Sequence, residues 1–142
     1  MSPMDRLLAH LRLTAEASQS AKDRAVLDSG LTKAQYNALL MLRHSGEATT
    51  SQLARDCNIS QQAMSQTVKR LSEAEFITLH PSPHSGRALV LRLTARGESS
   101  LTTADKRVRA LEQSLQDAAA PSRVDDLLTA LDRIREAATL YD

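Results

Sequence analysis

The sequence contains few of the residues on which several protein classes depend. It has one cysteine, four glycines and no tryptophan, and its only aromatic residues are Tyr36, Phe76 and Tyr141. A single cysteine excludes an internal disulfide framework and fits a reducing compartment. No apolar run approaches the roughly 20 residues that span a bilayer, and charged residues interrupt the apolar pattern of the N-terminus, unlike in a signal peptide. We therefore expect a soluble, cytoplasmic protein with no membrane partner.

The sequence also lacks the short motifs that accompany most enzymatic chemistry. G-x-S-x-G, Walker and H-E-x-x-H motifs are absent, and four glycines leave little room for a phosphate-binding loop. The histidines and Cys57 form neither an i,i+4 pair on a predicted helix nor a C-x-x-C motif, the usual spacings of metal ligands. We expect neither catalysis nor a metal or other cofactor.

The residues that are abundant favour one helical domain. A chain of 142 residues fits a single domain, and its richness in Ala, Leu, Arg and Glu is typical of helices. The net charge of +1 is unevenly distributed, because residues 49–97 carry six Lys or Arg and three Asp or Glu, whereas residues 98–142 carry six and nine. This asymmetry indicates that the middle segment meets an anionic partner.

Capping signals divide the chain into predicted helices. Ser2-Pro3-Met4-Asp5 should open the first helix, which carries leucines on one side and frays before Gly30. Later helices should start at the T-x-x-Q boxes of residues 32–35 and 49–52, at Ser60, at Thr94 and at residues 122–125. Gly46 and Pro121 should end the helices that precede them. The last two helices repeat apolar residues every three or four positions, so each has an apolar face.

Between the fourth and fifth predicted helices the apolar period changes from 3.6 to 2. Ile77 and Leu79 alternate with polar residues, and Leu89, Leu91 and Leu93 alternate with Ala88, Val90 and Arg92. This pattern predicts a two-stranded hairpin with a six-residue tip, Pro81 to Gly86. A lone hairpin is unstable in water, so its leucine face should lie on the helices.

Residues 52–71 predict a helix-turn-helix. Ala54 supplies the small residue needed where the two helices cross, and Asn58 suits the left-handed turn position. With Met64, Thr67, Val68 and Leu71 facing the core, the opposite face carries amides and hydroxyls rather than the usual Glu and Lys: Gln61, Gln62, Ser65 and Gln66. Glutamine can pair with adenine N6 and N7, and serine can contact bases or phosphates. These four are candidates for reading bases of double-stranded DNA, and Lys69 and Arg70 for binding phosphates; the alternative is a merely solvated polar face.

The hairpin tip is a second candidate contact. His84 and Arg87 lie at or beside the predicted tip, as in a wing, and such side chains are attracted to the negative potential of narrow A·T minor grooves. The alternative is a simple hairpin turn without a ligand.

The order of elements, with TSQLARDCNIS before the fourth helix and RALVLRLTARG after the wing, resembles the MarR family of bacterial transcriptional regulators. The L-T-x-x-G of Leu93, Thr94 and Gly97 carries the resemblance most specifically. It implies a mainly α fold with a small two-stranded β wing over residues 1–142. Residues 31–97 would form the winged helix-turn-helix DNA-binding lobe, and residues 1–30 and 98–142 the dimerisation helices.

The same resemblance implies a homodimer on pseudo-palindromic operators, commonly a repressor released by a small aromatic or anionic effector. Two departures stand out. The family's D-x-R in the wing is Ser82, Pro83 and His84 here, and the glycine after its recognition helix is Glu75. Two other functions stay open: a winged helix that binds only protein, and thiol-based redox sensing through Cys57.

Overall fold

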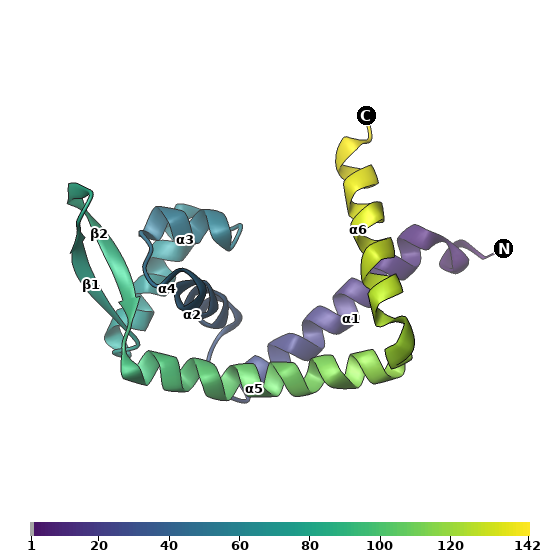
Figure 1. Ribbon diagram of the computed structural model, residues 1–142, viewed down its shortest axis with the longest axis horizontal. Coiled ribbons are helices and arrows are strands. Elements are labelled where there is room, and N and C mark those ends of the chain that lie inside the picture. Colours follow the sequence, from purple (N-terminus) through teal and green to yellow (C-terminus); the bar gives the residue numbers. More distant parts are fainter. Residues whose placement is uncertain (1) are drawn as a thin grey trace. The chain divides into compact units, whose positions relative to one another are not determined.

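The computed structural model describes residues 2–142, except the side chains of Ser85 and Arg87. It is mainly α with one two-stranded antiparallel sheet, as predicted (Figure 1). The elements in chain order are η1 (Pro3–Asp5), α1 (Leu7–Leu27), α2 (Lys33–Ser45), α3 (Thr50–Asp56), α4 (Gln61–Glu73), β1 (Ile77–Ser82), β2 (Ser85–Leu93), α5 (Ala95–Ala118), η2 (Pro121–Arg123) and α6 (Val124–Leu140). Two compact units form, one up to Val108 and one from Arg109 onward.

The capping residues fix where most helices start and stop. Both T-x-x-Q boxes form, with reciprocal side-chain to backbone hydrogen bonds at the starts of α2 and α3. The Ser60 hydroxyl accepts from the Ala63 N–H at 3.1 Å and begins α4, and Gly46 ends α2 with φ +83°. These predictions are confirmed because each depends on local bonds that the neighbouring sequence supplies.

One predicted helix start and one predicted helix cap are wrong. Ser2 and Asp5 do form a capping box, but it closes only the single turn η1, and α1 begins at Leu7 after an extended Arg6. Helix α6 begins at Val124, inside the predicted range 122–125, but Ser122 does not cap it. Arg123 is its N-cap and makes no side-chain capping bond, because the turn η2 occupies residues 121–123.

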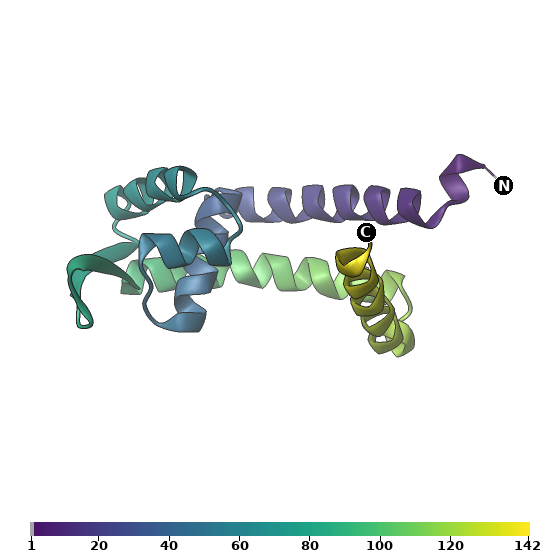
Figure 2. The ribbon, with the colours of Figure 1, turned by 90° about the horizontal axis from the view of Figure 1, so that it is seen from above.

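The core of the first unit lies where α2, α3 and α4 meet the base of the hairpin and the first half of α5. Its largest fully buried side chains include Tyr36, Leu39, Leu42, Leu53, Met64, Leu71, Leu91 and Leu101. The backbone of Leu91 also exchanges hydrogen bonds with Ala48, 2.7 and 3.3 Å long, which ties β2 to the segment between α2 and α3. Figure 2 shows the helix-turn-helix and the hairpin gathered at the start of α5.

The hairpin differs from the prediction in two ways. The strands extend further, so that only Pro83 and His84 lie between β1 and β2 instead of a six-residue tip. Burial is also uneven on the leucine face: Leu91 is fully buried, whereas its cross-strand partner Leu79 is 45% exposed and Leu89 is 52% exposed. Leu91 lies on β2, the strand that bridges to Ala48, whereas Leu79 lies opposite it on the outer strand β1. Leu89 lies nearer the tip, where the hairpin protrudes beyond the helices (Figure 1). Val90, expected on the open face, is buried.

A clasp formed by Glu75, Phe76, Thr94 and Gly97 joins the end of α4 to the start of α5. The Thr94 hydroxyl donates to the Glu75 carbonyl at 2.7 Å and accepts from the Gly97 N–H at 3.0 Å. The Thr94 N–H donates to the Phe76 carbonyl at 3.0 Å. The L-T-x-x-G motif thus has a structural basis, because its threonine and glycine hold together two helices that are distant in sequence.

Glu75 adopts the left-handed conformation, with φ +62°, which is unfavourable for a residue with a Cβ. We predict that Glu75→Gly raises the free energy of unfolding by about 1 kcal/mol, because relief of this strain exceeds the added flexibility of the unfolded chain. Urea denaturation followed by circular dichroism would measure it. The control is Ala74→Gly, one residue earlier at φ −79°, which should lower stability; equal effects at both positions would contradict the prediction.

Candidate nucleic-acid interface

Helix α4 presents two opposite faces. Met64, Thr67, Val68 and Leu71 are buried, and the polar residues between them are all exposed: Gln61, Gln62, Ser65, Gln66, Lys69 and Arg70. The Thr67 hydroxyl donates to the Ala63 carbonyl at 3.2 Å, so this buried polar group is satisfied within the helix. The predicted rotation of α4 is therefore confirmed, and the amide row faces outward.

The turn before α4 has the predicted geometry. Asn58 is left-handed, with φ +54°, and the Ile59 N–H donates to the Ala54 carbonyl at 3.0 Å. Ala54 is buried, which leaves space for α4 to pack closely against α3 (Figure 1). Asn58 and Ala54 thus act as the residue types of a helix-turn-helix require.

The glutamine side chains of α4 lack the internal hydrogen bonds that most other glutamines of the chain make. The side chains of Gln35 and Gln52 complete capping boxes, and those of Gln19 and Gln113 donate to nearby aspartates. Within the described residues, no hydrogen bond holds the side chains of Gln61, Gln62 or Gln66. These three amides retain their full donor and acceptor capacity for a ligand.

Positive charge follows the amide row along α4. Lys69 and Arg70 are exposed, and neither has an ion-pair partner in the described part of the chain. Some arginines elsewhere are paired, as in the 2.8 Å contact of Arg92 with Glu47. An unpaired surface cation is available to a phosphate at no cost of breaking an internal ion pair.

His84 lies exposed at the tip of the wing, where its backbone N–H donates to the Ser82 hydroxyl at 3.2 Å. Ser82 therefore orders the backbone of the short turn. The side chain of Arg87, the other predicted wing contact, lies outside the described residues. On β1 the Thr78 hydroxyl and the His80 Nε2 are 2.7 Å apart.

A partly buried polar network supports this lobe, and sequence reasoning missed it. The Tyr36 hydroxyl donates to Asp105 Oδ1 at 2.8 Å, and Arg43 Nη2 lies 3.2 Å from Asp105 Oδ2. Arg43 also approaches Glu98 at 3.6 Å. The residues that meet are more than 50 positions apart in sequence, so no local pattern could reveal them, yet they fix α2 against α5.

Cys57 has the chemistry of a structural cysteine. It is half-buried at the end of α3, and burial, with a smaller contribution from the Asp56 carboxylate, raises the pKa of its thiol. A raised pKa means less thiolate at neutral pH, and the thiolate is the form that oxidants attack. This environment is unfavourable for redox sensing.

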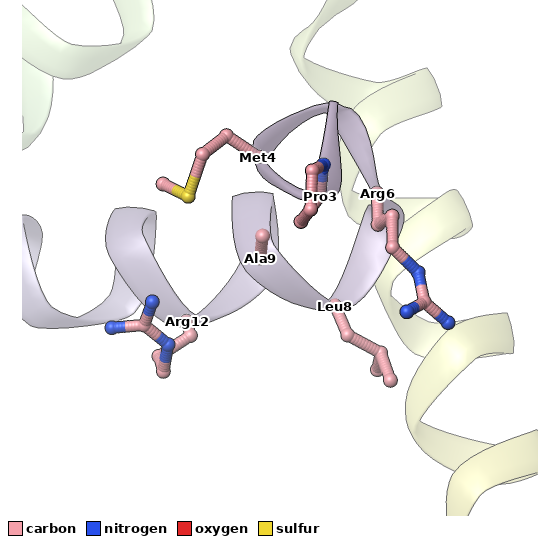
Figure 3. Close-up of a pocket in the computed structure, with 6 residues that line it drawn as sticks. All are labelled: Pro3, Met4, Arg6, Leu8, Ala9 and Arg12. Atoms are coloured by element: carbon pink, nitrogen blue, oxygen red, sulfur yellow. The ribbon is translucent and has the colours of Figure 1, made fainter. Parts of the chain in front are cut away.

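Exposed apolar side chains gather at the N-terminal end of α1 and along α6. Leu7 and Leu8 are 59% and 74% exposed, and Met4, Pro3 and Leu8 line a pocket of about 400 Å³ together with Ala9, Arg6 and Arg12 (Figure 3). In the second unit, Leu127 and Leu128 are about half exposed beside Val124. Patches of this kind mark surfaces that meet another protein.

Comparison with known proteins decides the class of this fold. Residues 29–88 match the model of the MarR family. The HTH-type transcriptional repressor Rv2887 of Mycobacterium tuberculosis is 32% identical over 111 residues, which cover 78% of each chain. The chain belongs to the MarR family.

Two solved structures show how closely this MarR-family chain follows the fold. The transcriptional repressor CouR, bound to a 23-mer DNA duplex, has a TM-score of 0.82 at 23% identity and covers 95% of this chain and 99% of its own. Bordetella bronchiseptica BpsR, studied for regulation of its DNA binding by 6-hydroxynicotinic acid, has a TM-score of 0.80 at 19% identity and covers 96% and 98%. The protein is a MarR-family transcriptional regulator with the winged-helix fold.

None of the described helices is long and apolar enough to cross a membrane. Among the same residues, no three His, Cys, Asp or Glu side chains come together as metal ligands would.

Proposed function

We propose that the protein is a homodimeric, sequence-specific DNA-binding repressor that reads a pseudo-palindromic operator. The observation that carries the proposal is the outward row of Gln61, Gln62, Ser65 and Gln66 on α4, whose glutamine amides have no partner among the described residues. These residues contact base edges in the major groove. Lys69 and Arg70 contact phosphates, and His84 and Arg87 extend the wing toward the minor groove.

The relatives support this proposal in two respects. Rv2887 is named a repressor, and CouR was solved on a DNA duplex. Two-fold related recognition helices would enter successive major grooves about 34 to 36 Å apart, which requires a pseudo-palindrome. As an intracellular regulator of this class, the protein works in the cytoplasm.

The experiment that tests the proposal is selection of bound sequences from random duplex, followed by fluorescence anisotropy over a range of salt concentrations. A DNA-binding regulator enriches a two-fold symmetric sequence and loses affinity steeply with salt, because neutralised phosphates release counterions. Absence of duplex binding at low salt would overturn the proposal and favour a protein-interaction module.

Dimerisation would bury the exposed apolar residues at the start of α1 and along α6. We predict that Leu8→Asp raises the dissociation constant of the dimer at least about tenfold, because it places an unpaired charge in the interface. Leu8 is 74% exposed in the single chain, so the substitution should leave the protomer folded. Sedimentation equilibrium measures the change, with Ser20→Asp, an exposed position later on α1, as the control. An unchanged dimer would contradict this placement of the interface.

Lys69→Ala should weaken binding to every duplex alike. A homodimer carries two copies of Lys69, each neutralising one phosphate, so the slope of log affinity against log salt should become shallower by about two. Anisotropy titrations between low and moderate salt on operator and random duplex give both slopes. A loss confined to the operator would instead assign Lys69 to base reading.

The repressor is released by a small aromatic or anionic effector in this proposal. Support comes from BpsR, whose DNA binding is described as regulated by 6-hydroxynicotinic acid. A ligand that binds the free dimer better than the DNA-bound form shifts the population away from DNA. A thermal-shift screen of aromatic acids, repeated with operator present, is the test: a ligand that stabilises the dimer should also release the duplex.

A further inference from the structure

We infer that the half-site read by α4 consists of A·T base pairs and that no guanine is required there. This inference rests on the proposed function and specifies its ligand. It comes from the chemistry of the side chains on the outward face of α4, each of which the structure places in solvent: Gln61, Gln62, Ala63, Ser65 and Gln66.

The first part of the argument is the three free amides. A glutamine amide offers one acceptor and two donors in one plane, which matches the N6 donor and N7 acceptor of adenine in the major groove. In this chain four other glutamines hydrogen-bond to the backbone or to aspartates. Gln61, Gln62 and Gln66 make no such bond within the described residues. Their amides need not break an internal bond to meet a base.

The second part is the absence of a cation on the same two turns. Arginine or lysine bound to guanine O6 and N7 is the commonest specific contact in the major groove. Residues 61–68 contain no Lys or Arg, and the first cation of α4 is Lys69. On the outward face of α4, guanine therefore lacks its usual cationic partner, whereas three glutamine amides are available to adenine.

The third part concerns the opposite strand. Ala63 is exposed between Gln62 and Ser65, and a methyl group at this place contacts the C5-methyl of thymine favourably. Gln62 and Gln66 lie four residues apart, about 6 Å along the helix axis, which corresponds to roughly two base-pair steps of about 3.4 Å. The expected half-site has two adenines separated by one or two base pairs, with a thymine methyl near Ala63.

The test uses the full-length dimer and the duplex that selection enriches. Adenines of each half-site are replaced one at a time by 7-deazaadenine, which lacks the N7 acceptor, and guanines by 7-deazaguanine. We expect about a fivefold or larger loss of affinity for at least two adenine positions and less than twofold for guanines. Gln62→Ala and Gln66→Ala should each abolish the loss of affinity caused by 7-deazaadenine at one adenine position. Gln116→Ala, which removes a glutamine of α5 whose side chain makes no hydrogen bond within the described residues, should leave this sensitivity unchanged.

The outcomes separate the inference from the proposed function. A selected half-site whose affinity depends on guanine N7, at positions sensitive to Gln62→Ala, would overturn the inference while the regulator still binds DNA. Failure to enrich any duplex would overturn the proposed function itself. A further variant sharpens the result: Gln62→Arg should move the preference at one position from adenine to guanine, and an unchanged preference would count against base reading by this residue.

Discussion

Gly97→Ala should prevent stable folding of the winged-helix lobe. A Cβ built on Gly97 overlaps the carbonyl oxygen of Phe76 and lies 2.9 Å from its carbonyl carbon. Both are backbone atoms, so no side chain can rotate away to make space. The same carbonyl accepts the Thr94 N–H, and any shift would weaken that bond. We expect the free energy of unfolding to fall by at least about 3 kcal/mol.

Urea denaturation followed by circular dichroism measures this loss, and a low yield of folded protein would be the extreme form of the expected result. Gly86→Ala is the matched control, because a Cβ at that glycine in the wing meets nothing within 4 Å. We expect that variant to change stability by less than about 0.5 kcal/mol. If Gly97→Ala behaved like Gly86→Ala, the close approach of α5 to Phe76 would not exist in solution.

Replacing Gln62 and Gln66 together by alanine should remove most of the discrimination between operator and random duplex. Each bidentate contact to a base contributes about 1 to 3 kcal/mol of discrimination, and a dimer on a palindrome loses each contact twice. We expect the affinity for the selected operator to fall by at least about 100-fold, with little change on random duplex. The fold should be unaffected, because both side chains are exposed and make no bond within the described residues.

Anisotropy titrations on both duplexes at one salt concentration give the ratio that decides this prediction. The double variant should keep the salt dependence of the parent protein, since its phosphate contacts remain. In this respect it differs from Lys69→Ala, which should alter the salt dependence and leave the ratio alone. Equal losses on operator and random duplex for both variants would refute the division between base-reading glutamines and a phosphate-binding lysine.

Features that depend on neighbours in sequence were predictable. The two T-x-x-Q boxes, the Ser60 cap, the left-handed Asn58 and the inward face of α4 all appear as expected. A cap or a turn is stabilised by hydrogen bonds within four or five residues, and an apolar helical stripe has only one way to face a core. The exposed row of candidate DNA contacts follows from that stripe.

Features that depend on residues distant in sequence could not be predicted. The leucine face of the hairpin was expected to lie on the helices, but Leu79 and Leu89 remain exposed. Which strand borders the helices, and how far the hairpin extends past them, depend on the packing of the whole lobe. The start of α1 and the cap of α6 were predicted wrongly where single 3₁₀ turns intervene. The network of Tyr36, Arg43 and Asp105 joins residues that no periodic pattern connects.

Adjacent residues were enough to predict the order of the helices, the helix-turn-helix and the face of α4 that is free to bind. What holds that face in place became visible only in the folded protein: the clasp of Thr94 and Gly97 on Glu75 and Phe76, and the Asp105 network between α2 and α5. The difference lies in how far apart along the chain the interacting residues are. Helical periodicity and caps depend on residues a few positions apart. Contacts between distant segments form only after the chain has folded and brought their atoms within bonding distance.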